Sequence, residues 1–252
     1  MTIKSFEGKK APYICTPLTG KTKEDVLKQV ENVVQQSPDL IEWRADFFTD
    51  LGSTDAVVEL IEEIKHKTDI PLLFTIRSVN EGGEAISLNE EAKVQLIQEI
   101  CRKTTVELVD YETANEAVYV KEVCKAAKDN KKQIILSYHN FSRTPDNAEI
   151  EERAKKAEAL GADIVKFAVM PEEKADVLRL LEVTKKIDNA LQAPVVSMSM
   201  GDIGGLSRII GWAYGSIITF GVGVESSAPG QIPAGKLRQA IKQTQELIPS
   251  WE

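Results

Sequence analysis

The sequence predicts an α/β protein, a single (β/α)8 TIM barrel that forms one catalytic domain over residues 1–252. Strand-like and helix-like segments alternate from one end of the chain to the other. The strand-like segments are continuous apolar runs, as in parallel sheets covered on both faces. The length suits one such barrel, and no change in composition marks a linker. An open, doubly wound sheet is the alternative, but no Gly-rich dinucleotide fingerprint follows the first strand.

Eight predicted strands follow one another at regular spacing. They are Tyr13–Thr16, Leu40–Arg44, Leu72–Arg77, Val106–Glu112, Gln133–His139, Ile164–Val169, Pro194–Met200 and Ser216–Gly221. Apolar residues at helical spacing lie between them, and they predict helices over 26–34, 57–64, 94–100, 118–126, 154–160, 177–187 and 235–248. Thr22, Ser53 and Asn89 precede acidic residues and are typical helix N-caps.

Composition excludes several classes of protein. The chain has 42% hydrophobic and 28% charged residues with a net charge of −8, and no basic stripe, so a nucleic-acid partner is not expected. Met1–Ala11 lacks the apolar core of a secretory signal, and no apolar run is long enough to span a membrane. Three cysteines without metal-ligand spacing, Cys15, Cys101 and Cys124, predict buried thiols in a reducing, cytoplasmic setting.

Lys166 is the most informative residue, because it lies within an apolar segment that reads as a buried strand. Burial withdraws water from an ammonium group and disfavours its charged form. A neutral lysine amine can attack a carbonyl and form a Schiff base. The alternative is a structural lysine whose aliphatic stem follows the strand while its charged end reaches water or an ion-pair partner.

Other predicted strands also end in charged or polar residues, and in a barrel these ends meet at one face. The candidates are Glu42, Arg44, Arg77, Glu81, Asp110, Glu112, His139, Lys166, Arg208, Ser227 and Gln231. Arginine binds carboxylates through two parallel hydrogen bonds, and Glu or Gln binds hydroxyls, so the set suits a small polyhydroxylated carboxylate. Structural ion pairs with Glu42, Asp46 and Glu81 are the alternative use of the arginines.

His139 ends the strand before that of Lys166. A lone histidine is usually a satisfied core residue, but at this place an imidazole can carry the protons of imine chemistry. A carboxylate such as Glu81 could fix its tautomer. Met198 and Met200 are expected to fill apolar gaps, and Trp43 to point outward beneath the helices.

Several segments together resemble the type I 3-dehydroquinate dehydratases. They are Ile41–Asp46, Thr75–Ser78 with Glu81–Glu84, Ser137–Phe141, Asp163–Lys166, Met198–Met200, Gly205–Arg208, Gly215–Gly221 and Ser227–Gln231. The resemblance covers about Pro12 to Gln231 in the order of the family. One departure lies in the first strand, where some relatives carry a serine followed by Leu-Met and this chain has Thr16-Pro17-Leu18-Thr19.

The resemblance implies dehydration of 3-dehydroquinate to 3-dehydroshikimate in the shikimate pathway, with no metal or cofactor. It assigns the imine to Lys166, general acid/base chemistry to His139 and support of that histidine to Glu81. It assigns the substrate carboxylate to Arg208, the substrate hydroxyls to Glu42, Arg44 and Arg77, and a loop that closes over the substrate to Ser227 and Gln231. It also implies a homodimer. Two alternative functions are a class I aldolase and a barrel that binds a metabolite without turnover.

Overall fold

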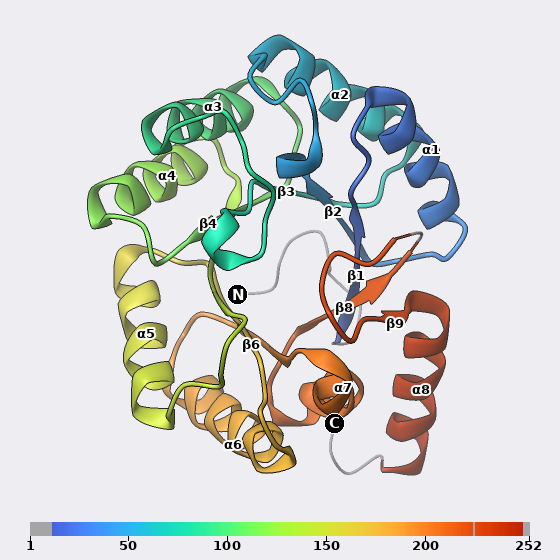
Figure 1. Cartoon of the computed structure of the whole chain (residues 1–252), viewed down its shortest axis with the longest axis vertical. Helices are drawn as coiled ribbons and strands as arrows, with labels where there is room; N and C mark the ends of the chain where they lie inside the picture. The colour runs from blue at the N-terminus through green and yellow to red at the C-terminus, as the bar shows by residue number, and fades with distance from the viewer. Residues whose placement is uncertain (1–11, 224, 249–252) are drawn as a thin grey trace.

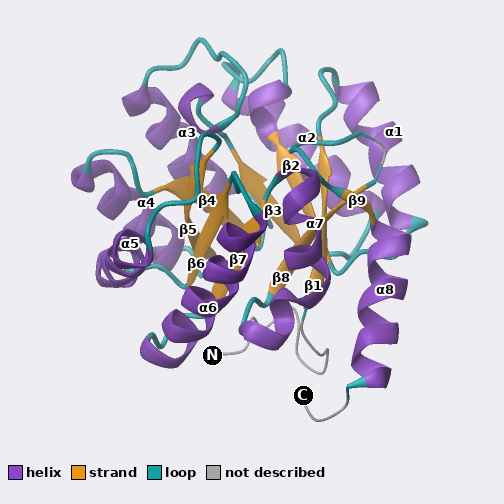
Figure 2. Ribbon diagram, turned by 60° about the horizontal axis from the view of Figure 1, so that its bottom comes forward, coloured by secondary structure: helices purple, strands orange, loops and turns teal. Residues whose placement is uncertain are grey.

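The computed structural model describes residues 12–223 and 225–248, so the segment Met1–Ala11 and its predicted lack of a leader lie outside the described residues. A parallel sheet forms the centre of the molecule, and helices surround it (Figures 1 and 2). The strands are β1 (Tyr13–Leu18), β2 (Leu40–Arg44), β3 (Leu72–Thr75), β4 (Leu108–Glu112), β5 (Gln133–Asn140), β6 (Ile164–Val169), β7 (Val195–Ser199), β8 (Ile218–Val222) and β9 (Ile232–Pro233).

One helix follows each of the first seven strands, and the eighth follows β9. The helices are α1 (Lys23–Val34), α2 (Thr54–Lys67), α3 (Glu90–Lys103), α4 (Ala117–Asp129), α5 (Asn147–Leu160), α6 (Lys174–Ala190), α7 (Gly201–Ile210) and α8 (Ala234–Leu247). Short 3-10 turns cover Ala45–Phe47, Val79–Glu81 and Gly211–Tyr214. The side chains of Thr22, Ser53 and Asn89 accept from backbone N–H groups of the first turns of α1, α2 and α3, as predicted.

The predicted (β/α)8 barrel is confirmed. The hydrogen-bonded strand order is β7-β6-β5-β4-β3-β2-β1-β8-β9, and every ladder is parallel. The ring closes between β7 and β8 through a parallel bridge from Val195 to Ser216, where the Ile217 N–H donates to the Val195 carbonyl at 2.9 Å. The two-residue strand β9 pairs with the end of β8 and returns the chain to the barrel rim.

Two elements were not predicted. Helix α7 contains three glycines, Gly201, Gly204 and Gly205, which weaken a helical pattern. Gly204 is needed because a Cβ there would lie 2.4 Å from the Ser199 carbonyl carbon. Strand β9 is too short to leave a sequence pattern. The predicted β3 also ends too late, because the chain leaves the ladder at Thr75 and places Arg77 in the loop that follows.

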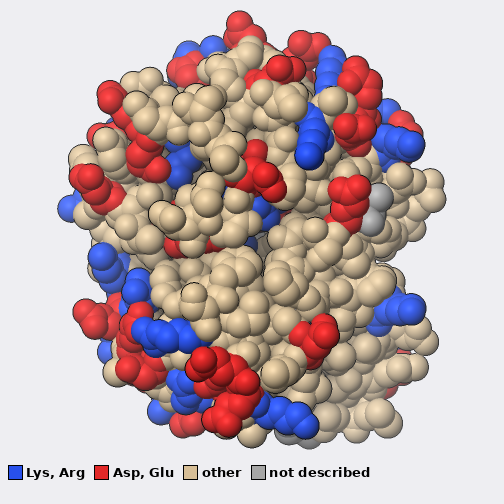
Figure 3. Space-filling model, viewed as in Figure 1, with Lys and Arg blue, Asp and Glu red and all other residues tan. Residues whose placement is uncertain are grey.

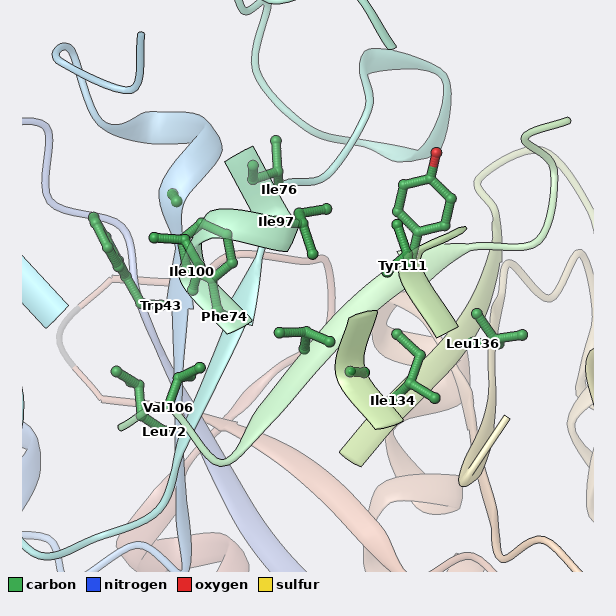
Figure 4. Packing of buried hydrophobic residues seen from close by; sticks show 14 of the residues in the cluster. Trp43, Leu72, Phe74, Ile76, Ile97, Ile100, Val106, Tyr111, Ile134 and Leu136 are labelled. Carbon is green, nitrogen blue, oxygen red and sulfur yellow. The ribbon is translucent and has the colours of Figure 1, made fainter. Parts of the chain in front are cut away.

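Two apolar layers hold the barrel together. The outer one lies between sheet and helices and contains Trp43, which packs edge-on against Phe74, so the predicted outward direction of Trp43 is confirmed (Figure 4). The inner layer fills the barrel interior with residues such as Leu40 and Ile135 and extends to Met200 and Phe220 beside the cavity. Above it the interior turns polar, and this change places a cavity at the C-terminal end of the strands.

The opposite end of the barrel carries a repeated contact. An acidic residue just before β2, β4 and β6 accepts a hydrogen bond from a backbone N–H at the start of the preceding strand. The pairs are Asp39 with Ile14 at 3.0 Å, Glu107 with Leu72 at 2.8 Å and Asp163 with Ile134 at 2.9 Å. Ser216, before β8, does the same with its hydroxyl for Ser197 of β7 at 3.0 Å. A side-chain hydrogen bond thus links β1 to β2, β3 to β4, β5 to β6 and β7 to β8.

No helix among residues 12–223 and 225–248 is long and apolar enough to cross a membrane. Charged side chains of both signs are scattered over the rim of the face seen in Figure 3, whereas its middle is mainly uncharged. Cys15, Cys101 and Cys124 are free and buried, as predicted.

Candidate active site

One cavity lies at the C-terminal end of the barrel, and nine of the eleven candidate residues line it, whereas Asp110 and Glu112 lie outside its wall. It encloses about 450 Å³ of space, part of it open to solvent. Its walls contain Lys166, His139, Glu81, Glu42, Arg44, Arg77, Arg208, Ser227 and Gln231, joined by Gly82, Phe141, Ala168, Met198, Met200, Phe220 and Ala228. The loops after β3 and β8, which lie toward the middle of the barrel in Figure 1, contribute Glu81 and Gly82, and Ser227, Ala228 and Gln231, to the lining of the cavity.

Lys166 projects from β6 into this cavity and is 4% exposed. Its ammonium nitrogen lies 3.6 Å from Asp110 Oδ2 and 3.9 Å from Glu42 Oε1. It also lies over the Phe220 ring, 4.4 Å from the ring centre. The two carboxylates compensate for the water that burial removes, and the aromatic face adds a weaker attraction for a cation. The lysine therefore has no route to bulk water along the strand, which excludes the extended surface lysine considered from sequence.

His139 and Glu81 form a buried pair beside the lysine. The His139 ring Nδ1 lies 2.8 Å from Glu81 Oε2, and the His139 backbone N–H donates to the same oxygen at 2.9 Å. A carboxylate that accepts from Nδ1–H leaves Nε2 as the free basic nitrogen.

Opposite pKa shifts act on this pair. Burial, with the charges of Arg77, Lys166 and Arg44, lowers the pKa of His139 well below its usual range. Burial and the nearby Glu112 raise the pKa of Glu81 to about 8. The pair therefore takes up or releases one shared proton near physiological pH.

Arg44 and Arg77 reach the cavity wall but are already ion-paired. Arg44 donates to both oxygens of Asp46 at 2.8 and 2.7 Å, which is one of the structural pairs considered from sequence. Arg77 donates to Asp110 at 2.7 Å and to Glu112 at 3.0 Å. These partners fix the guanidinium planes, so each arginine can present only its remaining N–H groups to a ligand.

Arg208 differs from them because it has no carboxylate partner among the described residues. It is 1% exposed and donates only to carbonyl oxygens of Phe220 and Pro229, at 3.3 and 3.1 Å, and weakly to the Met198 sulfur. Its Nε has no hydrogen-bond partner. Burial lowers the pKa of Arg208 to about 10. A buried guanidinium with free donors on a cavity wall is suited to bind an anionic ligand.

Ser227 and Gln231 are hydrogen-bonded to each other within the loop that covers one side of the cavity. The Ser227 backbone N–H donates to Gln231 Oε1 at 3.0 Å, and Gln231 Nε2 donates to Ser227 Oγ at 3.2 Å. Gly230 has φ +73°, and a Cβ there would lie 2.2 Å from the Gly201 carbonyl oxygen, so only glycine allows the loop to pack on α7.

Sequence reasoning left part of the site without a role. Asp110 was a candidate strand end, but neither its pattern nor the resemblance assigned it a function, and its contacts with Lys166 and Arg77 now single it out. Phe220 reads as an ordinary strand residue, although it lies against the lysine. Met198 and Met200 pack inside the barrel as predicted and also line the cavity. Thr16 is not part of the cavity wall, because the alternation of β1 places it on the helix side.

Fold and cavity together define a (β/α)8 barrel with a buried lysine on the wall of a cavity at the C-terminal end of its strands. The sequence pattern of the type I 3-dehydroquinase family matches residues 14–248. The chain belongs to this family. It is 46% identical over 235 residues to the 3-dehydroquinate dehydratase of Albidiferax ferrireducens, covering 93% of this chain and 89% of the relative. It is 44% identical over 231 residues to that of Shouchella clausii, covering 91% and 90%.

Solved structures agree with this assignment. The 3-dehydroquinate dehydratase of Geobacillus kaustophilus superimposes with a TM-score of 0.92 at 40% identity, covering 95% of this chain and 93% of that one. The type I enzyme of Clostridium difficile, solved with covalently modified comenic acid, gives 0.90 at 37% identity, covering 95% and 94%. A 3-hexulose-6-phosphate synthase, at 18% identity and a TM-score of 0.60, shares the fold alone.

Proposed function

We propose that this chain dehydrates 3-dehydroquinate to 3-dehydroshikimate in the shikimate pathway, through an imine on Lys166. The observation that carries the proposal is the position of the Lys166 amine, which is buried between two carboxylates on the wall of a cavity that His139 also lines. The names of the relatives give the substrate, and the family pattern gives the class of mechanism.

The amine solves the main chemical difficulty of the reaction. A β-hydroxy ketone loses water only if its α-proton can leave. The Lys166 nitrogen attacks the ketone carbon, and the ketone oxygen departs as water after it has taken up two protons. The product is an iminium ion, whose positive charge accepts the electron pair left behind when the α-proton is removed.

His139 is the residue we assign to proton transfer. Nε2 takes the α-proton and yields a neutral enamine. The imidazolium then gives that proton to the departing hydroxyl, the double bond forms, and the iminium is restored. Water hydrolyses the iminium and frees the amine. Glu81 holds the Nδ1–H tautomer and stabilises the imidazolium. Every proton and electron pair is carried by a side chain, water or the substrate.

The remaining wall residues bind and enclose the substrate in this proposal. Arg208 pairs with the substrate carboxylate, because it is the buried guanidinium whose described surroundings leave it without a carboxylate. Glu42, Arg44 and Arg77 contact the ring hydroxyls, and their ion pairs keep them rigid. Ser227 and Gln231 belong to a loop that closes over the ligand.

The family resemblance also supports a homodimer, and three buried thiols support a cytoplasmic location. We infer further that residues 1–252 act as one catalytic domain and that neither nucleic acid nor a cofactor takes part. Size-exclusion chromatography with light scattering tests the dimer: a mass near 28 kDa instead of its double contradicts it.

Borohydride reduction tests the mechanism directly. Reduction in the presence of 3-dehydroquinate should add the substrate skeleton to the peptide that contains Lys166, and Lys166→Met should abolish both adduct and turnover. Lys93→Met is the matched control, because Lys93 is equally buried, at 3% exposure, but pairs with Glu90 and lies over Tyr111 between sheet and helix. An adduct that persists in Lys166→Met contradicts the assignment.

A further inference from the structure

We infer that Asp110, a residue outside the cavity wall, is the positioning residue that sets the charge state of Lys166 and thereby the pH at which its amine is free to attack. The inference rests on the proposed function, because it takes imine formation on Lys166 as the step being controlled. It adds to that function a residue that acts on the nucleophile and never meets the substrate.

The two oxygens of Asp110 have different surroundings. Oδ1 accepts from Arg77 Nη2 at 2.7 Å and from the Ser137 hydroxyl at 2.7 Å. Oδ2 is buried without a hydrogen-bond partner, and the nearest cation is the Lys166 nitrogen at 3.6 Å. A buried carboxylate oxygen without a partner is unfavourable unless a charge lies close to it. The contacts on Oδ1 therefore hold Oδ2 toward the lysine.

Lys166 faces charged and titratable groups from four strands. Cys15 lies on β1, Glu42 on β2, Asp110 on β4 and His139 on β5. Lys166 forms ion pairs with the two carboxylates and acts electrostatically on the thiol and the imidazole. Cys15 is a thiol whose pKa burial raises well above its usual value, and the pKa of His139 is lowered, so both are neutral at pH 7. The two carboxylates thus provide the negative charge beside the amine.

Asp110 is the better placed of these two carboxylates. Glu42 lies on the cavity wall, where its Oε1 already accepts from Thr75 at 3.0 Å, and a bound ligand can change its surroundings. Asp110 is 2% exposed, lies behind the wall and is 0.3 Å closer to the lysine nitrogen, as the distances of 3.6 and 3.9 Å show. Arg77 and the neighbouring lysine both lower the pKa of Asp110, so its charge is constant through neutral pH.

A purely structural role for Asp110 would be to neutralise Arg77. Glu112 does that as well, at 3.0 Å from Arg77 Nη1, and it forms no ion pair with Lys166. Asp110 and Glu112 therefore share Arg77 as a partner, but only Asp110 also pairs with Lys166. Replacing each by its amide removes the same charge from the same network, but only Asp110→Asn removes it from beside the lysine. The loss should favour the neutral amine at a lower pH.

Carbamylation by cyanate measures this without any substrate. The Lys166 lone pair attacks the carbon of isocyanic acid, the N–C bond forms, and one proton moves from the amine to the cyanate nitrogen. Rates at Lys166 between pH 6 and 9 are followed by peptide mass mapping and divided by those at the exposed Lys236. We expect the loss of the Asp110 charge to move the pH at which the Lys166 amine becomes free down by about one unit. One pH unit is a tenfold change in free amine, so Asp110→Asn should react about tenfold faster at pH 7. Glu112→Gln should stay within about twofold of the wild type.

The same variants are then assayed for dehydration. In Asp110→Asn the acid limb of kcat/KM should move to lower pH by about the same interval. Glu112→Gln is the control for the carbamylation rates only, because Glu112 also raises the pKa of Glu81. Equal carbamylation of wild type and Asp110→Asn, or equal acceleration in both variants, overturns the inference. If Asp110→Asn does not fold, Ser137→Ala, which releases Oδ1, should give a smaller shift in the same direction, and no shift overturns it too. A missing borohydride adduct in the wild type would instead contradict the proposed function.

Discussion

Replacing Arg208 by methionine should stabilise the protein and nearly abolish its activity. The guanidinium is buried, and burial lowers its pKa to about 10. Because a tenfold change in a protonation equilibrium is about 1.4 kcal/mol, this depression corresponds to roughly 3 kcal/mol of unfavourable burial. The folded-state pKa lies below that of the unfolded chain, so the penalty is fully present at pH 7 and is relieved only above about pH 10.

Methionine removes this penalty but leaves the Phe220 and Pro229 carbonyls without their donor. These hydrogen bonds are long, at 3.3 and 3.1 Å, so we expect a net gain of about 1–2 kcal/mol in the free energy of unfolding. In a protein of this size the gain corresponds to a rise in Tm of roughly 2–8 °C. Thermal and urea unfolding at pH 7 measure it.

Activity should change in the opposite direction. Two charge-assisted hydrogen bonds to a carboxylate contribute about 1.5–3 kcal/mol each, so kcat/KM should fall by about 10²–10⁴. Arg208→Ala should lose more than Arg208→Lys, which keeps the charge without the fork. Arg102→Met, at an exposed arginine paired with Glu99, serves as the control and should change neither quantity much. A less stable Arg208→Met protein, or one with normal kcat/KM, would refute the reasoning.

Three further outcomes are expected. His139→Ala should still form the borohydride-trapped adduct but turn over about 10²–10⁴-fold more slowly, and a loss within tenfold contradicts general acid/base catalysis. Glu81→Gln should have a free energy of unfolding at least about 1 kcal/mol higher than the wild type at pH 9 and an equal one near pH 4. The reason is that the Glu81 carboxyl has a pKa of 4.5 in the unfolded chain and about 8 in the folded protein, so its ionisation destabilises the wild type only at high pH. Urea titrations at both pH values measure the difference. Amides of residues 226–232 should exchange quickly in the free protein and slowly with product bound, and equal protection would show a static rim.

The fold could be predicted because its strands are apolar on both faces and because α1, α2 and α3 begin at side-chain caps that the sequence shows. The parts that failed depend on contacts that a local sequence pattern does not contain. Helix α7 is rich in glycine, and it forms because Gly204 lets it approach Ser199, a tertiary contact that no local pattern contains. The exit of Arg77 from β3 is set by partners 33 and 35 residues away, Asp110 and Glu112, rather than by its own neighbours.

The site was predictable as a set of residue types at strand ends, and family resemblance supplied roles that remain to be tested. Sequence could not rank the charges. Arg44, Arg77 and Arg208 look alike in the chain, but the first two are neutralised by carboxylates and the third is not. Asp110 and Glu112 are two residues apart on one strand, yet only one approaches the lysine. Such differences depend on distances across the barrel.

The hydrogen bonds that link β1 to β2, β3 to β4, β5 to β6 and β7 to β8 make the barrel modular. Cutting the chain between α2 and β3, or between α4 and β5, leaves every such hydrogen bond intact, whereas a cut between α1 and β2 separates Asp39 from Ile14. Circular permutants opened at the first two places should therefore refold more readily than one opened at the third. The barrel is in this sense a ring of four two-stranded units, and a gene that duplicates or exchanges such a unit would move an intact building block.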